Sequence, residues 1–272
     1  MSLAPPGLAL PPDERSVSAA PDADLERRFG GLRRLYGEVG YARVRAARMA
    51  IVGLGGVGSW CAEALARSGV AALTLIDLDH VAESNVNRQV QALGATLGQS
   101  KVQALRERIA DIHPGCVVHG IEEFVAADNW PGLLPGRVDV VIDACDQARA
   151  KVALAAWALA TGNHLVVAGA AGGKRLPHAV QVEDLGLVTH DPMLASLRRC
   201  LRKDHGAARS GEIGLRCVFS REAVAMPVES QESTLAPGGG LNCQGYGSSV
   251  VVTATFGMVA ASLALEFAAA RK

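Results

Sequence analysis

The feature that most constrains the fold of this chain is the stretch GLGGVG at residues 53–58, which directly follows the apolar run MAIV. Gly53, Gly55 and Gly58 have the G-x-G-x-x-G spacing, and a helical pattern over residues 56–68 begins inside the motif. Between a strand and a helix, such glycines let the backbone approach a phosphate group at the N-terminus of the helix. The alternative is that they only permit a tight turn and close packing. The context favours the first interpretation and predicts a nucleotide-binding turn.

Strand-like and helix-like segments alternate through the rest of the first half of the chain. Apolar runs suited to strands cover residues 71–79, 116–124, 138–146 and 164–170, and helical patterns cover residues 99–112 and 147–161. This alternation indicates parallel strands joined by crossover helices. The predicted fold class is therefore α/β, with a Rossmann-like, doubly wound and mostly parallel sheet. A basic, helical stretch at residues 25–48 precedes the first strand.

The regular alternation ends after residue 171. The later segments are strand-like runs at 178–185, 215–220 and 223–227, a basic helical stretch at 191–206, a Gly-rich loop at 229–248 that we expect to be mobile, and an apolar helix at 249–270. They predict a mixed α+β extension on the same sheet. We therefore expect a disordered tail at 1–25 and one domain at 26–268, with a nucleotide-binding half at about 26–170 and a substrate-side extension at about 171–268.

Charge and cysteine usage limit the classes of partner. The chain has 27 basic and 27 acidic residues, so no global field of one sign attracts nucleic acid, and an RNA partner must be bound by a local patch. Six cysteines without a C-x-x-C pair argue against a structural zinc site or a disulfide framework and favour the cytoplasm. Segment 249–270 approaches bilayer length but is weakly hydrophobic, so a buried core helix is favoured over a membrane anchor.

Polar residues after the second strand distinguish between nucleotides. Asp77 ends that strand, where a carboxylate can accept hydrogen bonds from ribose hydroxyls of NAD or ATP. Asp79 is better explained as a loop or helix cap. The stretch SNVNRQ at 84–89 then supplies Asn85, Arg88 and Gln89, and Lys101 begins the next helical pattern.

Cations at the phosphates favour ATP over NAD. Hydride transfer needs no positive charge there, whereas attack on a phosphoryl group needs charge placed on its oxygens. Each cation alone could be a solvated surface charge, but Arg88 and Lys101 form a set with Asn85 and the glycine turn. An NAD dehydrogenase would also need a hydride-transfer residue set that the sequence does not display.

The stretch VIDACDQ places two carboxylates after the fourth strand, at the edge where α/β sheets bind ligands. A carboxylate there can hold Mg²⁺ against a triphosphate. Asp146 is the better candidate, because Asp143 lies within the strand and is expected only to support the loop.

Several of these stretches together resemble the ubiquitin-activating-enzyme superfamily of adenylating enzymes, also called the ThiF/MoeB/HesA superfamily. They are GLGGVGSWCAEALARSGV, LTLIDLDHVAESNVNRQ, GQSKV and VIDACDQ. Within the superfamily, RFGGLRRLYG, AGAAGG, CVFS and VTATFG resemble the tRNA threonylcarbamoyladenosine dehydratases. The likeness covers about residues 26–268. It implies an ATP-binding homodimer that adenylates the threonyl carboxylate of a modified adenosine in tRNA and closes it into a ring.

The resemblance also implies roles for single residues. It makes Asp77 the ribose ligand, Asn85, Arg88 and Lys101 the amide and cations at the phosphates, and Asp146 the magnesium ligand. Arg88, Lys101 and Asp146 are thereby the expected catalytic residues. It further suggests a monovalent cation, Na⁺ or K⁺, near AGAAGG.

One position departs from the superfamily pattern. Sulfur-carrier activators have an arginine shortly after an N-terminal Arg-aromatic pair, which reaches the partner subunit's ATP, but Gly30 and Gly31 stand there in this chain. Arg33 or Arg34 are the candidates to replace it.

Two other functions are alternatives to the dehydratase, and a surface for RNA is expected in addition. The first alternative is an adenylating activator of a ubiquitin-like sulfur-carrier protein, with transfer to Cys217 or Cys243 and a cysteine-desulfurase or sulfur-acceptor partner. The second is a non-catalytic sulfur acceptor or scaffold. Local basic clusters are the expected tRNA contacts, against the alternative of a solvated helix face. Their members are Lys174, Arg175, Arg198, Arg199, Arg202 and Lys203.

Overall fold

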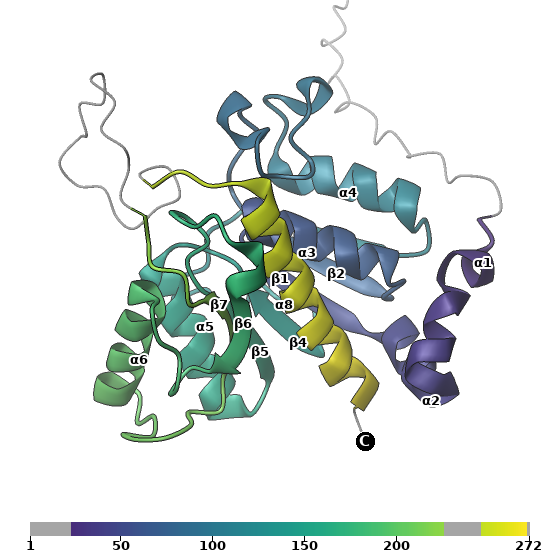
Figure 1. Ribbon diagram of the computed structural model, residues 1–272. Coiled ribbons are helices and arrows are strands. Elements are labelled where there is room, and N and C mark those ends of the chain that lie inside the picture. Colours follow the sequence, from purple (N-terminus) through teal and green to yellow (C-terminus); the bar gives the residue numbers. More distant parts are fainter. Residues whose placement is uncertain (1–22, 226–245, 271–272) are drawn as a thin grey trace, which may run out of the picture.

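The computed structural model describes residues 23–225 and 246–270 (Figure 1). Its strands are β1 (Arg48–Val52), β2 (Ala72–Ile76), β3 (Val117–Ile121), β4 (Val140–Asp143), β5 (His164–Ala168), β6 (Val180–Asp184) and β7 (Arg216–Ser220). Its α-helices are α1 (Leu25–Phe29), α2 (Arg33–Ala46), α3 (Gly56–Arg67), α4 (Lys101–Ile112), α5 (Ala148–Thr161), α6 (Pro192–Asp204) and α8 (Val250–Ala270). Short 3₁₀ turns are η1 (Gly30–Leu32), η2 (Glu83–Asn85), η3 (Gly94–Thr96) and η4 (Pro177–Ala179).

The strands form one sheet in the order β3-β2-β1-β4-β5-β7-β6. All neighbouring pairs are parallel except β6 and β7, which are antiparallel. The predicted doubly wound, mostly parallel sheet is therefore confirmed. The chain crosses from β1 to β2 on one side and from β4 to β5 on the other, and ligands of open α/β sheets bind where this order reverses, beside β1 and β4.

The central strands are buried on both faces because helices cover each side. Successive side chains of a strand point to opposite faces. Accordingly, Met49 and Ile51 of β1 join a core with α3, α4 and α8, while Ala50 and Val52 join a core with α5 and α6. This explains why β1, β2 and β4 are nearly continuous apolar runs and do not alternate with polar residues.

Helix α8 is the core helix expected from segment 249–270. It is long and apolar enough to cross a membrane by composition, but Phe256, Ala260 and Ala264 are fully buried in the core that α3 shares. Gly257 allows the close contact, because a Cβ atom at this position would lie 2.5 Å from the carbonyl oxygen of Val57. The helix thereby crosses the sheet beside α3 (Figure 1). Its first turn lies against the glycine motif, because a Cβ atom on Gly56 would lie 3.0 Å from the Thr253 side chain.

The second half of the chain extends the sheet as expected, with one correction. Strands β6 and β7 and helix α6 follow the predicted runs, but Ala223–Ala225, the described part of the third predicted strand, are not in a strand. The backbone amide of Ala225 donates instead to the carbonyl of Gly173 in the AGAAGG loop, at 2.8 Å. Residues 1–22 of the tail expected at 1–25 and residues 229–245 of the Gly-rich loop lie outside the described residues, and Leu25 already belongs to α1.

Candidate functional site

Packing requires two of the three glycines of the turn but not the third. Gly53 has φ +86°, and a Cβ atom there would lie 2.8 Å from the backbone of Cys145. A Cβ atom on Gly58 would lie 1.8 Å from the carbonyl oxygen of Gly53. By contrast, a Cβ atom on Gly55 meets nothing within 4 Å. Gly53 and Gly58 are thus required by packing, whereas Gly55 leaves open space beside the first amides of α3, which have no intrahelical partner.

This difference gives a matched pair of variants. Gly58→Ala should lower the free energy of unfolding by about 1–3 kcal/mol, because α3 must move away from the turn. Gly55→Ala should leave the free energy of unfolding within about 0.5 kcal/mol of wild type. It should nevertheless weaken nucleotide binding, since its methyl group enters the space beside the helix N-terminus. Urea unfolding and nucleotide titration of both variants measure this, and equal loss of stability in the two would contradict it.

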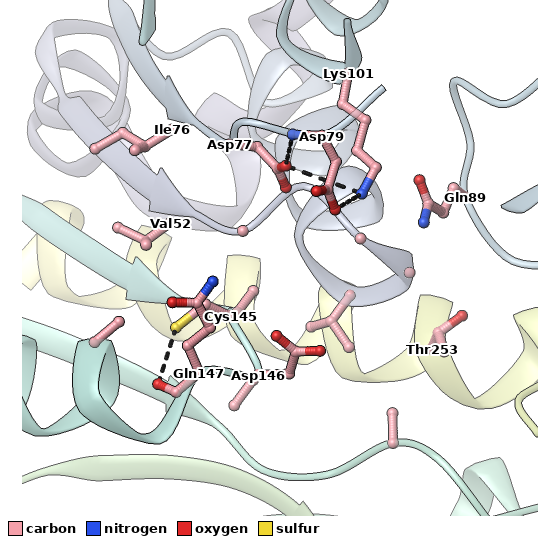
Figure 2. A pocket seen from close by; sticks show the side chains of 18 of the residues that line it. Val52, Ile76, Asp77, Asp79, Gln89, Lys101, Cys145, Asp146, Gln147 and Thr253 are labelled. Atoms are coloured by element: carbon pink, nitrogen blue, oxygen red, sulfur yellow. Dashed lines mark hydrogen bonds and ion pairs between the residues drawn. The ribbon is translucent and has the colours of Figure 1, made fainter. Parts of the chain in front are cut away.

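A cavity of about 580 Å³ opens at the carboxyl ends of β1, β2, β4 and β5 (Figure 2). It lies at the reversal of the strand order. The residues predicted to bind the nucleotide line this cavity, with the exception of Gly58, which is buried against the carbonyl group of Gly53. Those that line it are Gly53, Gly55, Asp77, Asn85, Arg88, Gln89, Lys101 and Asp146.

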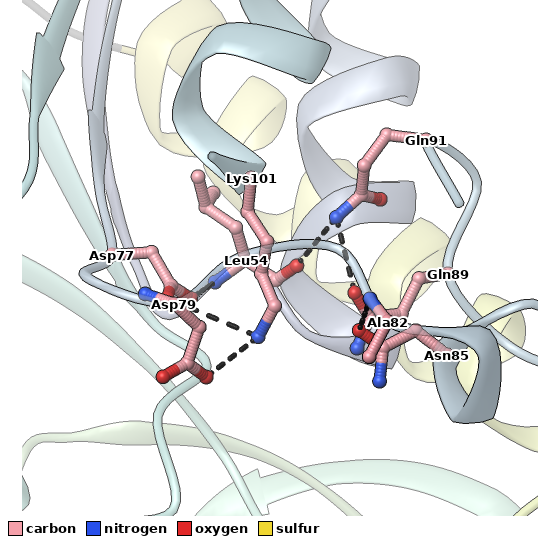
Figure 3. Close-up of polar contacts among 8 residues, drawn as sticks. All are labelled: Leu54, Asp77, Asp79, Ala82, Asn85, Gln89, Gln91 and Lys101. Carbon is pink, nitrogen blue, oxygen red and sulfur yellow. Dashed lines mark hydrogen bonds and ion pairs between the residues drawn. The ribbon is translucent and has the colours of Figure 1, made fainter. Parts of the chain in front are cut away.

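Asp77 and Lys101 form the wall of the cavity on the β2 side (Figure 3). Asp77 Oδ2 accepts the amide of Leu54 at 2.6 Å, and its Oδ1 accepts the amide of Asp79 at 2.8 Å. Lys101 Nζ lies 2.7 Å from Asp79 Oδ2 and 3.9 Å from Asp77 Oδ1. Burial raises the pKa of Asp77, although Lys101 and the two amides act in the opposite direction. The cap role expected for the Asp79 side chain is wrong, because that carboxylate pairs with Lys101.

Buried amides hold the loop after β2 (Figure 3). Asn85 Oδ1 accepts the backbone amide of Ala82 at 3.1 Å and closes the turn η2. Gln89 Oε1 accepts Gln91 Nε2 at 3.1 Å, and the same nitrogen donates to the carbonyl of Leu54 at 3.0 Å. Gln91, which no sequence signal singled out, therefore links this loop to the glycine turn.

Arg88 extends from the same loop with its charge uncompensated. Its Nη1 donates to the carbonyl of Ser84 and, at 3.0 Å, to Asn87 Oδ1, and no ion pair of Arg88 occurs within residues 23–225 and 246–270. Its backbone carbonyl accepts Trp60 Nε1 of α3 at 3.0 Å and Thr253 Oγ1 of α8 at 3.4 Å. Helices from distant parts of the chain thus fix the position of Arg88, and Thr253 itself lines the cavity.

Two carboxylates at and after the end of β4, on the opposite side of the cavity, have different surroundings. Asp146 is exposed and extends into the cavity from the loop after β4 (Figure 2). Asp143 is fully buried, and its Oδ1 lies 3.0 Å from Lys151 Nζ and accepts the amide of Cys145 at 3.2 Å. This is the loop support expected of Asp143.

Lys151 joins the strand ends behind that wall. Besides Asp143 of β4, its ammonium donates to the carbonyl of Ala168 in β5 at 2.8 Å. Burial alone would lower the pKa of Lys151, but Asp143, together with Cys145 and Asp191, outweighs burial and the net pKa is raised. The ammonium therefore stays charged and holds together the two strand ends from which the cavity loops begin.

The basic residues after AGAAGG need correction. Lys174 is 2% exposed, and its Nζ donates to the carbonyls of Ser220 at 3.2 Å and Glu222 at 2.8 Å. Burial also lowers its pKa. The expectation that Lys174 contacts RNA is therefore wrong, because its ammonium points into the protein. Arg175 is exposed, as that expectation requires.

The two arginine candidates for a contact across a dimer differ. Arg33 is bound within its own chain, with Nη1 3.0 Å from Glu26 and Nε 3.1 Å from Glu38, and it lies over the Tyr41 ring. Arg34 is exposed. Arg34 is thus the better placed of the two.

Of the two cysteines considered as nucleophiles, the structure describes only one. Cys217 is fully buried, and burial raises the pKa of its thiol well above the ordinary range. Cys243 lies outside the described residues.

Comparisons with known proteins agree on the class of site. The model of the ThiF family matches residues 29–270. A tRNA threonylcarbamoyladenosine dehydratase of Escherichia coli is 42% identical over 88% of this chain and 92% of its own length, and one of Haemophilus influenzae is 38% identical over 89% and 94%. The crystal structure of the E. coli tRNA N6-threonylcarbamoyladenosine dehydratase in complex with ATP has a TM-score of 0.82 and 41% identity, covering 92% of this chain and 97% of that one. The complex of that enzyme with AMP has a TM-score of 0.81.

Proposed function

The chain belongs to the ThiF family, and we propose that it is an ATP-dependent dehydratase that adenylates the threonyl carboxylate of threonylcarbamoyladenosine in tRNA and cyclises it. Two relatives that share nearly their whole length with it carry this dehydratase name, and one of them binds ATP and AMP. The observation that carries the proposal is the uncompensated guanidinium of Arg88 at a cavity built on a glycine turn.

ATP lies in the proposed complex along the cavity, with its phosphates at the turn. Asp77 accepts ribose hydroxyls, and the first amides of α3 face the phosphates at Gly55. Asn85 and Gln89 set the shape of the loop that carries Arg88. The cavity of about 580 Å³ falls within the usual range for ligand pockets, about 300–1,000 Å³.

The first chemical step is attack of the threonyl carboxylate on the α-phosphate. Arg88 and Lys101 stabilise the charge that develops on the phosphoryl oxygens and on the leaving pyrophosphate. In the second step, a nucleophile in the same side chain attacks the activated carbonyl and expels AMP. Tethering gives this nucleophile a high effective molarity, so no enzyme nucleophile is needed. The net change in the nucleoside is the loss of one water.

Asp146 is the proposed magnesium ligand. Mg²⁺ commonly binds through one or two carboxylates together with substrate phosphates, so a single exposed carboxylate across the cavity from the cations fits it. The ion supplies charge neutralisation for the triphosphate. Within the described residues, no group of three or more His, Cys, Asp or Glu side chains gathers into a metal site. A monovalent cation near AGAAGG stays a prediction from the resemblance.

The assembly belongs to the same proposal. We expect a homodimer in the cytoplasm, in which Arg34 is the residue to examine for a contact with the partner subunit's nucleotide. Activation of a sulfur-carrier protein is less well supported, because buried Cys217 cannot accept an acyl group without local unfolding. A scaffold without catalysis would not need an unpaired arginine at the cavity.

Mass spectrometry of nucleosides tests the proposed reaction. Threonylcarbamoylated tRNA is incubated with the protein and Mg-ATP and then digested. We expect the modified nucleoside to lose one water, with AMP and pyrophosphate released in equal amounts. An unchanged nucleoside, together with a thioester on a carrier protein supplied in the same assay, would instead support the sulfur-carrier function.

A further inference from the structure

Helix α6 carries a basic surface outside the cavity. The side chains of Arg198, Arg199, Arg202, Lys203 and Arg209, together with Ala195, line a groove of about 560 Å³, and we call this set the α6 groove. The opposite stripe of the helix, Leu194, Leu197 and Leu201, is buried in the core shared with α5. An amphipathic helix of this kind holds its polar face toward solvent.

The positive charge of the α6 groove is fixed in place but barely neutralised. Arg198 Nη1 donates to the carbonyls of Leu185 at 3.1 Å and Val188 at 2.7 Å, and Arg202 Nε donates to the carbonyl of Ala208 at 2.9 Å. Carbonyl oxygens orient these guanidinium groups without cancelling their charge. Across the described ranges, the one ion pair formed by these cations joins Lys203 to Asp204 at 4.0 Å, and the Lys203 side chain is 79% exposed.

The net charge of α6 supports an anionic ligand. Four cations and one carboxylate give the helix a charge of +3, in a chain whose total charge is zero. Backbone phosphates are attracted to such a local patch whatever the net charge of the whole chain. No aromatic side chain lines the groove to stack a base, and no amide side chain lines it to read adenine, so its polar side chains are all arginine or lysine.

The position of α6 relates the groove to the cavity. Met193, the second residue of α6, lines the cavity. With a rise of 1.5 Å per residue, Arg199 lies about 9 Å and Lys203 about 15 Å further along the helix. The groove therefore lies close enough to the cavity for one RNA strand to contact both.

We propose that the α6 groove is the docking surface for the tRNA backbone, where it binds successive phosphates of the strand that carries the modified adenosine. This inference rests on the proposed function. Arg199, Lys203 and Arg209 are the exposed contacts, while Arg198 and Arg202 are held in place by carbonyl groups. The groove sets the register of the tRNA, and the cavity performs the chemistry.

The test compares two triple variants. Arg199→Ala/Lys203→Ala/Arg209→Ala removes the three exposed cations of the groove. Arg27→Ala/Arg106→Ala/Arg137→Ala removes three exposed arginines on α1, on α4 and before β4, away from α6 (Figure 1). The Kd for threonylcarbamoylated tRNA is measured at 50 and 200 mM salt, and kcat and KM are measured for tRNA and ATP.

We expect the Kd of the α6 variant to depend less on salt than the Kd of the wild-type protein. Between the two salt concentrations the wild-type protein should lose about 20–40-fold more affinity than the α6 variant, because three phosphate contacts each contribute a slope of about 0.7–0.9. The control variant should match wild type. In the α6 variant the KM for tRNA should rise, while kcat at saturating tRNA and the KM for ATP stay unchanged.

Two results would overturn the docking surface. One is a wild-type salt dependence and a wild-type KM for tRNA in the α6 variant. The other is an equal loss in both triple variants, which would show only a general charge effect. Failure of the wild-type protein to dehydrate the nucleoside would overturn the proposed function, whereas the binding measurements judge the docking surface independently.

Discussion

Arg88→Ala should slow adenylation by a factor corresponding to about 3–4 kcal/mol in the activation barrier, as for removal of one preorganised charge-stabilising donor. The guanidinium lines the cavity without a carboxylate partner in the described part of the chain, so its charge is available to phosphoryl oxygens. ATP–pyrophosphate exchange in the presence of the tRNA substrate measures this step. Exchange at a near wild-type rate would refute the role of Arg88.

Controls separate a catalytic loss from a structural one. Arg88 bonds through its side chain only to Ser84 and Asn87 of its own loop, so unfolding in urea should be nearly unchanged by the substitution. Arg88→Lys should recover part of the exchange rate, since it keeps the charge but loses the planar donor geometry. Arg106→Ala, an exposed arginine on α4, should exchange at the wild-type rate.

Lys151→Met should lower the free energy of unfolding by about 3–5 kcal/mol, the range for breaking a buried ion pair from one side. The substitution leaves the Asp143 carboxylate buried without its cation and removes the donor to the Ala168 carbonyl. The side chains of both partners are at most 1% exposed, so water cannot solvate the carboxylate that loses its partner. Urea unfolding measures the effect.

An exposed lysine and a double variant test whether the loss of stability in Lys151→Met is electrostatic. Lys203→Met removes the same charge from a side chain that is 79% exposed, and it should change stability by less than about 0.5 kcal/mol. Lys151→Met/Asp143→Leu should recover much of the loss, because an apolar pair of similar volume needs no counter-ion. A double variant as unstable as Lys151→Met would contradict the electrostatic explanation.

The agreement between sequence and structure at the cavity follows from sheet geometry. Asp77 and Asp146 each follow a parallel strand, and the carboxyl ends of parallel strands meet at one edge of the sheet. The chain segments after these strands must therefore share a cavity. The G-x-G-x-x-G turn predicted the position of the cavity for a steric reason, since two of its glycines avoid a collision that any Cβ atom would cause.

The direction in which a loop side chain points could not be predicted from the sequence. Lys174 and Arg175 are adjacent and equally basic in the sequence, yet one ammonium is buried on carbonyl groups and the other side chain is exposed. Asp79 pairs with Lys101 and does not cap a turn. Which way a loop residue points depends on neighbours that are distant in the sequence, so no local pattern contains it.

Local patterns alone determined the α/β class, the order of strands and helices, and the residues after each strand end, because these depend on periodicity and on turn chemistry within a few residues. Only the tertiary structure decided that Thr253 and Gln91 support the glycine turn and the Arg88 loop, that Lys151 holds β4 to β5, and that Arg209 joins the cations of α6 in one groove. The reason is that burial, hydrogen bonds and ion pairs arise between segments far apart in the sequence, 165 residues in the case of Arg88 and Thr253, and their free energy depends on the packed interior.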